Sequence, residues 1–324
     1  MSRAHPIYLD CNSTTPLEPE VGKVIRHFFE EEFGNEGSRT HAFGSRAKDA
    51  VNHARQQVAQ LVDCKMEEVI FTSGATESNN LAILGLAHWG RSHGKTHIIS
   101  SRIEHKAVLE PIEVLAKDGF EVDWVAPEKN GKVEAAKLLQ RVRPTTLLVS
   151  LMHANNETGV IQPIDKVAQG LADHPAWFHV DAAQTFGKLI EPLRNHRIDL
   201  ISASGHKIYG PKGVGVLVVR HRKKQKVPLQ PLVFGGGQEH GLRPGTLPVP
   251  LVVGFGLAAE LGLQHHVERE KRCLTFRRKF LQAIEPLGPK IHGDEGQVLA
   301  HTANLSFPGL SAEEAMVRLK NHVA

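Results

Sequence analysis

The sequence predicts an α/β fold, in which a three-layer, mostly parallel sheet is flanked by helices and followed by part of a smaller α+β domain. Short apolar runs alternate with amphipathic stretches from residue 69 to residue 219, as expected when strands and helices take turns along the chain. The length of 324 residues and the hydrophobic share of 41% are sufficient for a sizeable buried core.

Composition and charge exclude several classes of protein. Lysine and arginine number 39 against 35 aspartates and glutamates, a net charge of +4, so no broadly basic nucleic-acid surface is expected. The dense basic run at residues 220–226 is interpreted as a solvated turn. Cys11, Cys64 and Cys273 lie far apart without metal-ligand spacing, which predicts neither a disulfide framework nor a metal site. Without an apolar signal segment or membrane-length run, a cytoplasmic protein that binds no membrane is expected.

The amino-terminal part is expected to be mainly helical. Residues 7–10 are interpreted as a short strand that ends in a turn cluster. Apolar residues at helical spacing predict helices over residues 18–32 and 47–62, with a glycine-containing loop at 33–40 between them.

The strand at residues 69–72 leads through a glycine-containing turn into a helix predicted at 79–89. Such a turn aims free backbone N–H groups at one point, where the helix dipole favours negative charge, so residues 73–78 are a candidate phosphate site. A plain helix cap with Ser73 or Thr76 as the capping residue is the more frequent meaning of this pattern alone.

The alternation then continues to residue 219. Further strands are predicted at 97–100, 120–125, 146–151, 177–181, 198–201 and 214–219, and helices at 107–117, 134–141 and 164–172. In such sheets, ligands bind beyond the carboxyl ends of the strands.

Polar residues follow five of these strands, which predicts one shared site at the edge of the sheet. They are Thr76; Glu104, His105 and Lys106; His153 to Glu157; Asp181 to Gln184; and Ser204, His206 and Lys207. Lys207 lies on a short turn between two apolar runs, which suits a lysine that forms a Schiff base with pyridoxal phosphate. A surface lysine in a polar loop is about equally compatible with that stretch on its own.

The remainder is interpreted as a glycine-rich loop and the beginning of a second domain. The loop at residues 234–246 has a backbone that can approach a ligand or partner closely. A long helix at 251–284, a strand at 303–307 and a helix that begins with a capping box at Ser311 follow it.

Ordered motifs along nearly the whole chain resemble the cysteine desulfurases and selenocysteine lyases, which are class V aminotransferases of the fold-type I pyridoxal phosphate enzymes. The motifs are Tyr8-Leu9-Asp10 with Thr14-Thr15-Pro16, residues 71–80 (FTSGATESNN), 104–108 (EHKAV), 152–159 (MHANNETG), 179–184 (HVDAAQ), 204–213 (SGHKIYGPKG) and 243–248 (RPGTLP). So many motifs in order are a specific signal.

The resemblance implies a role for each motif residue. Lys207 would hold the cofactor covalently and move the Cα proton, and His105 would stack on the ring and take part in proton transfer. The cofactor contacts implied are Asp181 to the ring nitrogen, Gln184 to the ring hydroxyl, Asn156 near that edge, Ala75, Thr76, Ser204 and His206 to the phosphate, and Thr246 to the phosphate of the neighbouring subunit.

The resemblance also implies the reaction and the assembly. A homodimer would convert L-cysteine to L-alanine and pass the sulfur, as a persulfide, to an acceptor protein for iron–sulfur cluster or other thio-cofactor synthesis. A selenocysteine lyase and a cofactor-binding scaffold without desulfurase activity are the alternatives. The implied domains are a large cofactor-binding domain at residues 17–259 and a partial small domain at 1–16 and 260–324.

The family's sulfur-accepting cysteine raises a separate expectation. In the family it lies on a Gly/Ser-rich loop after a helix that corresponds to the end of this sequence, together with an arginine that binds the substrate carboxylate. We therefore expect the sequence to be a truncated one that stops before that loop. Cys11 follows Asp10 and is a weak substitute, so no cysteine is nominated as the catalytic nucleophile.

Overall fold

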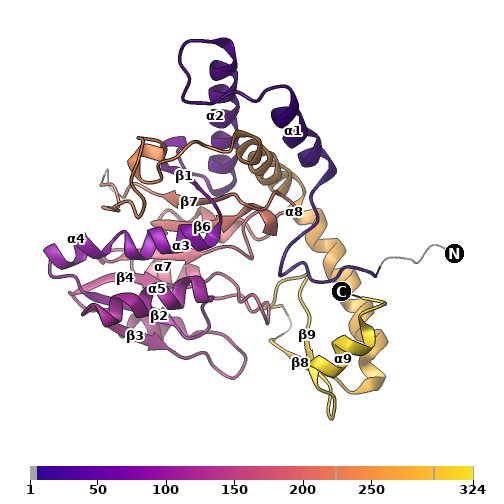
Figure 1. The fold of residues 1–324 in the computed structure, drawn as a ribbon. Helices are drawn as coiled ribbons and strands as arrows, with labels where there is room; N and C mark the ends of the chain where they lie inside the picture. The colour runs from indigo at the N-terminus through magenta and orange to yellow at the C-terminus, as the bar shows by residue number, and fades with distance from the viewer. Residues whose placement is uncertain (1–5, 223–224, 295, 324) are drawn as a thin grey trace.

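The computed structural model describes residues 6–222, 225–294 and 296–323, and it confirms the predicted α/β class (Figure 1). Two residues of the basic run, 223–224, lie outside the described part, as do residues 1–5 and residue 324 of the expected small domain. No helix within the described ranges is both long and apolar enough to cross a membrane.

One seven-stranded sheet forms the middle layer, in the order β1-β7-β6-β5-β4-β2-β3. Only β7 runs antiparallel to its neighbours, so β1 to β6 all end at the same edge. The strands are β1 Val69–Thr72, β2 His97–Ser101, β3 Glu121–Val125, β4 Thr146–Ser150, β5 Trp177–Asp181, β6 Leu200–Ser204 and β7 Gly215–Val219.

Helices cover both faces of this sheet because alternate strand residues point to opposite sides. One apolar cluster joins one face to helices α3 Ala75–Leu84, α4 Ala87–Ser92 and α5 Lys106–Lys117. A second cluster joins the other face to α1 Pro19–Glu30, α2 Ala42–Val62, α6 Ala135–Leu139, α7 Ile164–Gly170 and the first part of α8 Val249–Ile284. Every residue of the other six strands is buried, as expected for a parallel sheet between two helical layers, whereas in the edge strand β3 only Val125 is.

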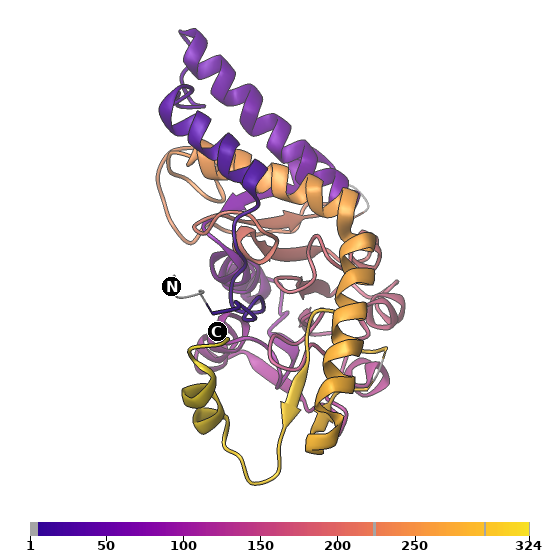
Figure 2. The same cartoon turned by 90° about the vertical axis from the view of Figure 1, so that its right-hand side faces the viewer.

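Helix α8 connects the sheet to a small carboxyl-terminal unit, which contains β8 Lys290–His292, β9 Asn304–Ser306 and α9 Ala312–Leu319 (Figure 2). The buried residues of α8 end at Gly262, and the rest of the helix leaves the core. Ile7 donates its N–H to the carbonyl of His322 at 2.9 Å, so the amino-terminal segment joins the same unit. We therefore propose a domain boundary near residue 260, inside the continuous helix.

Two local predictions were wrong, and one strand was missed. Residues 7–10 form no strand, and only Ile7 makes a single bridge, to Val323. The helix expected at 79–89 begins at Ala75 and is interrupted, because the carbonyl of Gly85 accepts the N–H of Gln230. Strand β8 was not predicted, since its three residues carry little apolar signal.

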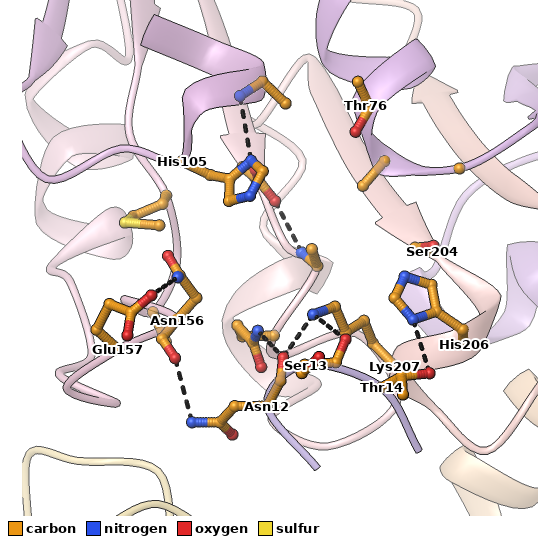
Figure 3. Close-up of a pocket in the computed structure, with 18 of the residues that line it drawn as sticks. Asn12, Ser13, Thr14, Thr76, His105, Asn156, Glu157, Ser204, His206 and Lys207 are labelled. Atoms are coloured by element: carbon orange, nitrogen blue, oxygen red, sulfur yellow. Dashed lines mark hydrogen bonds between the residues drawn. The ribbon is translucent and has the colours of Figure 1, made fainter. Parts of the chain in front are cut away.

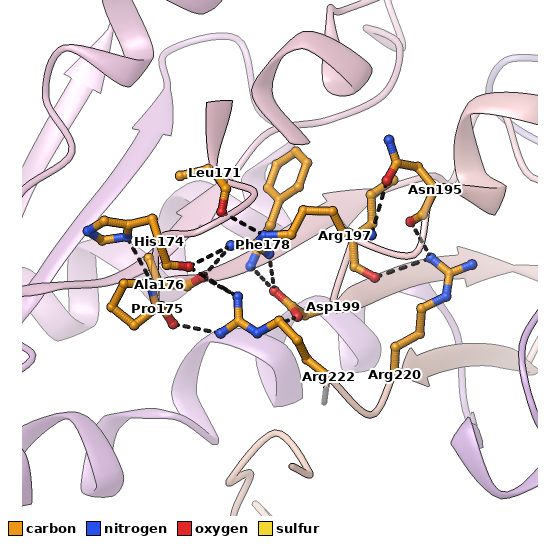
Figure 4. A network of polar contacts seen from close by, with 11 residues as sticks. Leu171, His174, Pro175, Ala176, Phe178, Asn195, Arg197, Asp199, Arg220 and Arg222 are labelled. Atoms are coloured by element: carbon orange, nitrogen blue, oxygen red, sulfur yellow. Dashed lines mark hydrogen bonds and ion pairs between the residues drawn. The ribbon is translucent and has the colours of Figure 1, made fainter. Parts of the chain in front are cut away.

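At the amino-terminal end of β6, a buried carboxylate is surrounded by arginines (Figure 4). Asp199 accepts the N–H of Phe178 at 2.7 Å and an N–H of Arg197 at 2.6 Å, and Arg222 lies 3.6 Å away. Arg220 donates to neighbouring backbone carbonyls, including that of Asn195 at 2.9 Å. This network fixes the edge of the sheet that is remote from the predicted site.

Candidate active site

A cavity of about 970 Å³ lies where β1, β2, β4, β5 and β6 end. Nine of the ten predicted site residues line it, so strand ends far apart in the sequence do meet at one place. They are Ala75, Thr76, His105, Asn156, Asp181, Gln184, Ser204, His206 and Lys207. Segments 9–14 and 301–303 close the cavity from the side of the small unit.

The turn after β1 presents unpaired backbone donors to the cavity. Helix α3 begins at Ala75, and its cap residue Gly74 has no side chain, so the predicted capping by Ser73 or Thr76 is wrong. Within the described residues, the N–H groups of Ala75 and Thr76 have no acceptor. A β-carbon on Gly215 would lie 2.5 Å from the Cα of Gly74, so the strand β7 supports this turn at very close range. Ser204 and His206 line the same cavity, which makes this end a site for an anion.

Asp181 provides a buried carboxylate at the end of β5. Its side chain accepts the amide N–H of Asn79 at 2.8 Å and the backbone N–H of Ala183 at 2.9 Å. Burial raises the pKa of the Asp181 carboxyl, and these two hydrogen bonds together with the nearby His105 and Lys207 counteract the rise. The carboxylate is therefore fixed in direction and suited to hold a proton on a ring nitrogen.

Lys207 lies in a short 3₁₀ turn, Gly205–Lys207, directly after β6. Its Nζ donates to the carbonyl of Ser13 at 2.7 Å and also to the carbonyl of Asn12 (Figure 3). Burial lowers the pKa of the Lys207 amine, against the attraction of Asp181, Asp10 and Glu157. The amine is thus held inside the cavity with an increased share of its neutral form.

His206 points to the anion end of the cavity, with its Nδ1 3.1 Å from the hydroxyl of Thr14. Burial, followed by the positive charges of Lys207, Lys212 and Lys188, lowers the pKa of His206 to about 4. The ring is therefore neutral near pH 7, where it acts as a hydrogen-bond partner and not as a charge.

The remaining polar residues are tied to the amino-terminal segment. Gln184 donates to the carbonyl of Asn12 at 2.9 Å, and Asn12 donates to the carbonyl of Asn156 at 3.2 Å. The side-chain amide of Asn156 donates to Glu157 at 2.7 Å. Segment 12–14 therefore connects Lys207 with both amides, which no local sequence pattern indicates.

The cavity fits pyridoxal phosphate. Among the described residues, the buried side-chain oxygens of Asn79 and Gln184 have no hydrogen-bond partner, although both residues line the cavity. Buried polar atoms are rarely left unpaired, so these two oxygens indicate a polar ligand. Unpaired N–H groups for a phosphate, a fixed carboxylate for a ring nitrogen and a lysine amine for an aldehyde match the chemistry of this cofactor.

Thr246 is the one predicted site residue that does not line the cavity, and it is exposed. Its loop is anchored by Glu239, whose carboxylate binds Arg55 at 2.9 Å and the N–H of Phe71 at 2.6 Å. Arg243 from the same loop pairs with Glu77 in the first turn of α3 at 3.0 Å. The loop is therefore held beside the first turn of α3, and Thr246 is exposed.

None of the three cysteines lines the cavity, although Cys11 lies between the lining residues Asp10 and Asn12. Burial raises the pKa of Cys11 and of Cys273, and it raises the pKa of Cys64 to about 12. A raised pKa reduces the thiolate fraction, so none of them has the features of an activated nucleophile.

Glu104 and Asn79 contribute to the site in ways that the sequence did not indicate. Glu104 accepts the hydroxyl of Ser101 at 2.6 Å and the N–H of Met152 at 3.0 Å, and burial raises its pKa to about 8. Asn79 orients Asp181. Both residues lie within motifs that the sequence singled out, but their partners are distant in sequence.

The chain matches the aminotransferase class-V family over residues 7–323. The cysteine desulfurase IscS of Vibrio cholerae is 43% identical over 319 residues, which cover 98% of this chain and 78% of that protein. The IscS of Rickettsia africae is 43% identical over 318 residues, which cover 98% of this chain and 77% of that protein.

Solved structures are similar as well. DndA from Streptomyces lividans is 49% identical with a TM-score of 0.89, covering 95% of this chain and 87% of that one. SspA in complex with cysteine is 34% identical with a TM-score of 0.83, and the match covers 98% of this chain and 88% of that one. With the family match over nearly the full length and these relatives on the same fold, the chain belongs to the aminotransferase class-V family.

Proposed function

We propose that this protein is a pyridoxal phosphate-dependent cysteine desulfurase, which removes sulfur from L-cysteine and leaves L-alanine. The observation that carries the proposal is the meeting of Lys207, Asp181, His105 and the first turn of α3 around one cavity. The relatives named cysteine desulfurase and the neighbour solved with cysteine support L-cysteine as the substrate.

Pyridoxal phosphate, when bound, supplies an electron-withdrawing ring that stabilises negative charge at the substrate Cα. The N–H groups of Ala75 and Thr76 would hold its phosphate, together with Ser204 and His206. Asp181 would hold the proton on the ring nitrogen, because Asn79 and Ala183 fix the direction of its carboxylate. Gln184 would hydrogen-bond the ring hydroxyl, and Asn156 would lie near it.

Lys207 would anchor the cofactor and move the Cα proton. The lowered pKa of its amine favours the neutral form, whose lone pair can accept a proton at Nζ. The carbonyls of Asn12 and Ser13 offer the released amine a fixed position inside the cavity. Positioned proton transfer of this kind is worth roughly 100-fold to 10,000-fold in rate.

The overall conversion balances without an added oxidant. L-cysteine and an acceptor thiol give L-alanine and a persulfide, since the C–S bond breaks while an S–S bond forms. We assign the acceptor role to none of Cys11, Cys64 and Cys273, because none lines the cavity. The persulfide sulfur would pass to an acceptor protein for iron–sulfur cluster or other thio-cofactor synthesis, in the cytoplasm, where thiols stay reduced.

We further propose a homodimer in which Thr246 serves the neighbouring active site. Thr246 is exposed and its loop is anchored on its own subunit, so it is presented outward. Phe33 is 68% exposed and Phe234 is 85% exposed, and the segments that follow them line one groove of about 960 Å³. Exposed aromatic side chains beside a groove support a surface that a second copy covers.

The function is tested by incubating the cofactor-loaded protein with L-cysteine and a small thiol, and measuring alanine and sulfide. Lys207→Ala should lower the rate by about 100-fold or more. Lys117→Ala is the control, because Lys117 is exposed on helix α5 and does not line the cavity, and it should stay within about threefold of wild type. Equal losses in the two variants would contradict the role of Lys207. If the protein formed alanine from L-selenocysteine but not from L-cysteine, the selenocysteine lyase alternative would be favoured.

A further inference from the structure

His105 has only one ring nitrogen available to the cavity. It is the cap residue of helix α5, and its Nδ1 accepts the backbone N–H of Ala107 at 3.1 Å. Figure 3 shows this bond on one edge of the ring, with the opposite edge turned toward the cavity. A nitrogen that accepts a hydrogen bond must carry its lone pair, so the neutral ring carries its hydrogen on Nε2.

The capping bond cannot be given up without cost. Ala107 is 7% exposed, and within the described residues its N–H has no acceptor other than His105. The carbonyl of His105 meanwhile accepts the N–H groups of Val108 and Leu109, which fixes the backbone at the helix start. Loss of a cap typically shifts an equilibrium by about fivefold to thirtyfold, so the ring strongly favours this one tautomer.

The preceding residue restrains the backbone that carries the ring. Glu104 is buried and holds its carboxyl between Ser101 at the end of β2 and the N–H of Met152 just after β4. His105 is therefore attached to two strand ends on one side and to helix α5 on the other. Rotation of the ring to present Nδ1 would break the bond that, among the described residues, alone pairs the Ala107 N–H.

We propose that His105 acts in the reaction as a fixed Nε2–H hydrogen-bond donor, and that Lys207 alone accepts the Cα proton. This inference rests on the proposed function. A general base at His105 would need a lone pair on Nε2 and a hydrogen on Nδ1, where it would face the N–H of Ala107. Lys207 has no such restriction, because its amine can rotate between the carbonyls of Asn12 and Ser13 and the cavity.

The tautomer can be read directly by NMR of protein with ¹⁵N-labelled histidine, with and without pyridoxal phosphate. The His105 signals are identified by their loss in His105→Asn, a variant that keeps a side-chain acceptor for the cap but has no Nε2. We expect an unprotonated Nδ1 and a protonated Nε2 in both states. A protonated Nδ1 in either state would overturn the inference.

A second measurement assigns the proton transfer. L-alanine is incubated with the loaded enzyme in deuterated water, and exchange of its Cα hydrogen is followed. We expect His105→Asn to keep this exchange within about tenfold of wild type, and Lys207→Ala to lose it by about 100-fold or more. If His105→Asn loses exchange as completely as Lys207→Ala while it stays folded and retains the cofactor, His105 is the base and the inference is wrong. If the wild type exchanges nothing, the proposed function fails, and the ¹⁵N spectrum still decides the tautomer.

Discussion

Each functional side chain is defined by a few distant partners. Lys207 and Asp181 lie at strand ends, where the sequence predicted them, but their states depend on neighbours such as Ser13 and Asn79. Lys207 and Asn12 are separated by 195 positions in the chain. A motif therefore predicts which residue lies in the site, whereas the orientation and charge of its side chain depend on partners that only the folded structure brings together.

The buried histidines predict that the free energy of unfolding depends on pH. His179 lies between the hydroxyls of Ser150 and Ser202, and burial lowers its pKa from 6.5 to about 3. Between these values the unfolded chain binds a proton that the folded chain does not, so the free energy of unfolding falls as the pH is lowered from about 6.5. Between about pH 7 and about pH 5, protonation of this one group in the unfolded chain should lower the free energy of unfolding by about 2 kcal/mol.

Denaturant unfolding at the two pH values measures this effect. His179→Gln removes the titrating group. Its free energy of unfolding should therefore fall by about 2 kcal/mol less than that of wild type over the same interval. His88→Gln, on the exposed face of α4, is the matched control and should follow the wild type. If the free energy of unfolding fell equally for wild type and His179→Gln between the two pH values, the lowered pKa of His179 would be contradicted.

At the scale of elements, the strands were easier to predict than the helix boundaries. Fully buried strands such as β4 and β5 are continuous apolar runs, so their positions agree with the sequence pattern within about a residue. The interruption between α3 and α4 depends on a hydrogen bond from Gln230, which no pattern near Gly85 contains. The placement of the Thr246 loop likewise depends on the distant Arg55–Glu239 pair.

The contact between β7 and the turn after β1 predicts a sensitive position. A β-carbon on Gly215 would lie 2.5 Å from the Cα of Gly74 and 2.5 Å from the carbonyl oxygen of Ala203, both of which are backbone atoms. Gly215→Ala should displace the start of α3 and weaken binding of pyridoxal phosphate by about tenfold or more, as overpacking typically costs 1–3 kcal/mol.

Titration of cofactor-free protein with pyridoxal phosphate measures this change. Gly22→Ala, on helix α1, is the control, because a β-carbon there meets only Leu17 at an ordinary 3.4 Å. If Gly215→Ala folds and binds the cofactor as tightly as Gly22→Ala, the turn after β1 is not the phosphate site.

At the scale of the whole molecule, the proposed dimer makes a specific prediction about Thr246. Mixed dimers are prepared from two differently tagged chains, one of which carries Lys207→Ala, so that only one lysine-linked site remains. Adding Thr246→Ala to the Lys207→Ala chain should speed cofactor loss from the remaining site, because that chain supplies the Thr246 loop to it. Adding Thr246→Ala to the other chain should leave cofactor loss unchanged.

Absorbance of the lysine-linked cofactor during dilution follows this loss. The reverse pattern would show that Thr246 serves its own subunit, and a chain that stays monomeric under loading conditions would contradict the shared site altogether.

The proposed function depends on Lys207 as the attachment point of the cofactor. The loaded protein is reduced with borohydride, digested and mapped by mass spectrometry. We expect one pyridoxyl label per chain, on the peptide that contains Lys207, and no label after Lys207→Ala. A label on Lys188 or Lys212 in place of Lys207, or a folded protein that takes up no label, would contradict it.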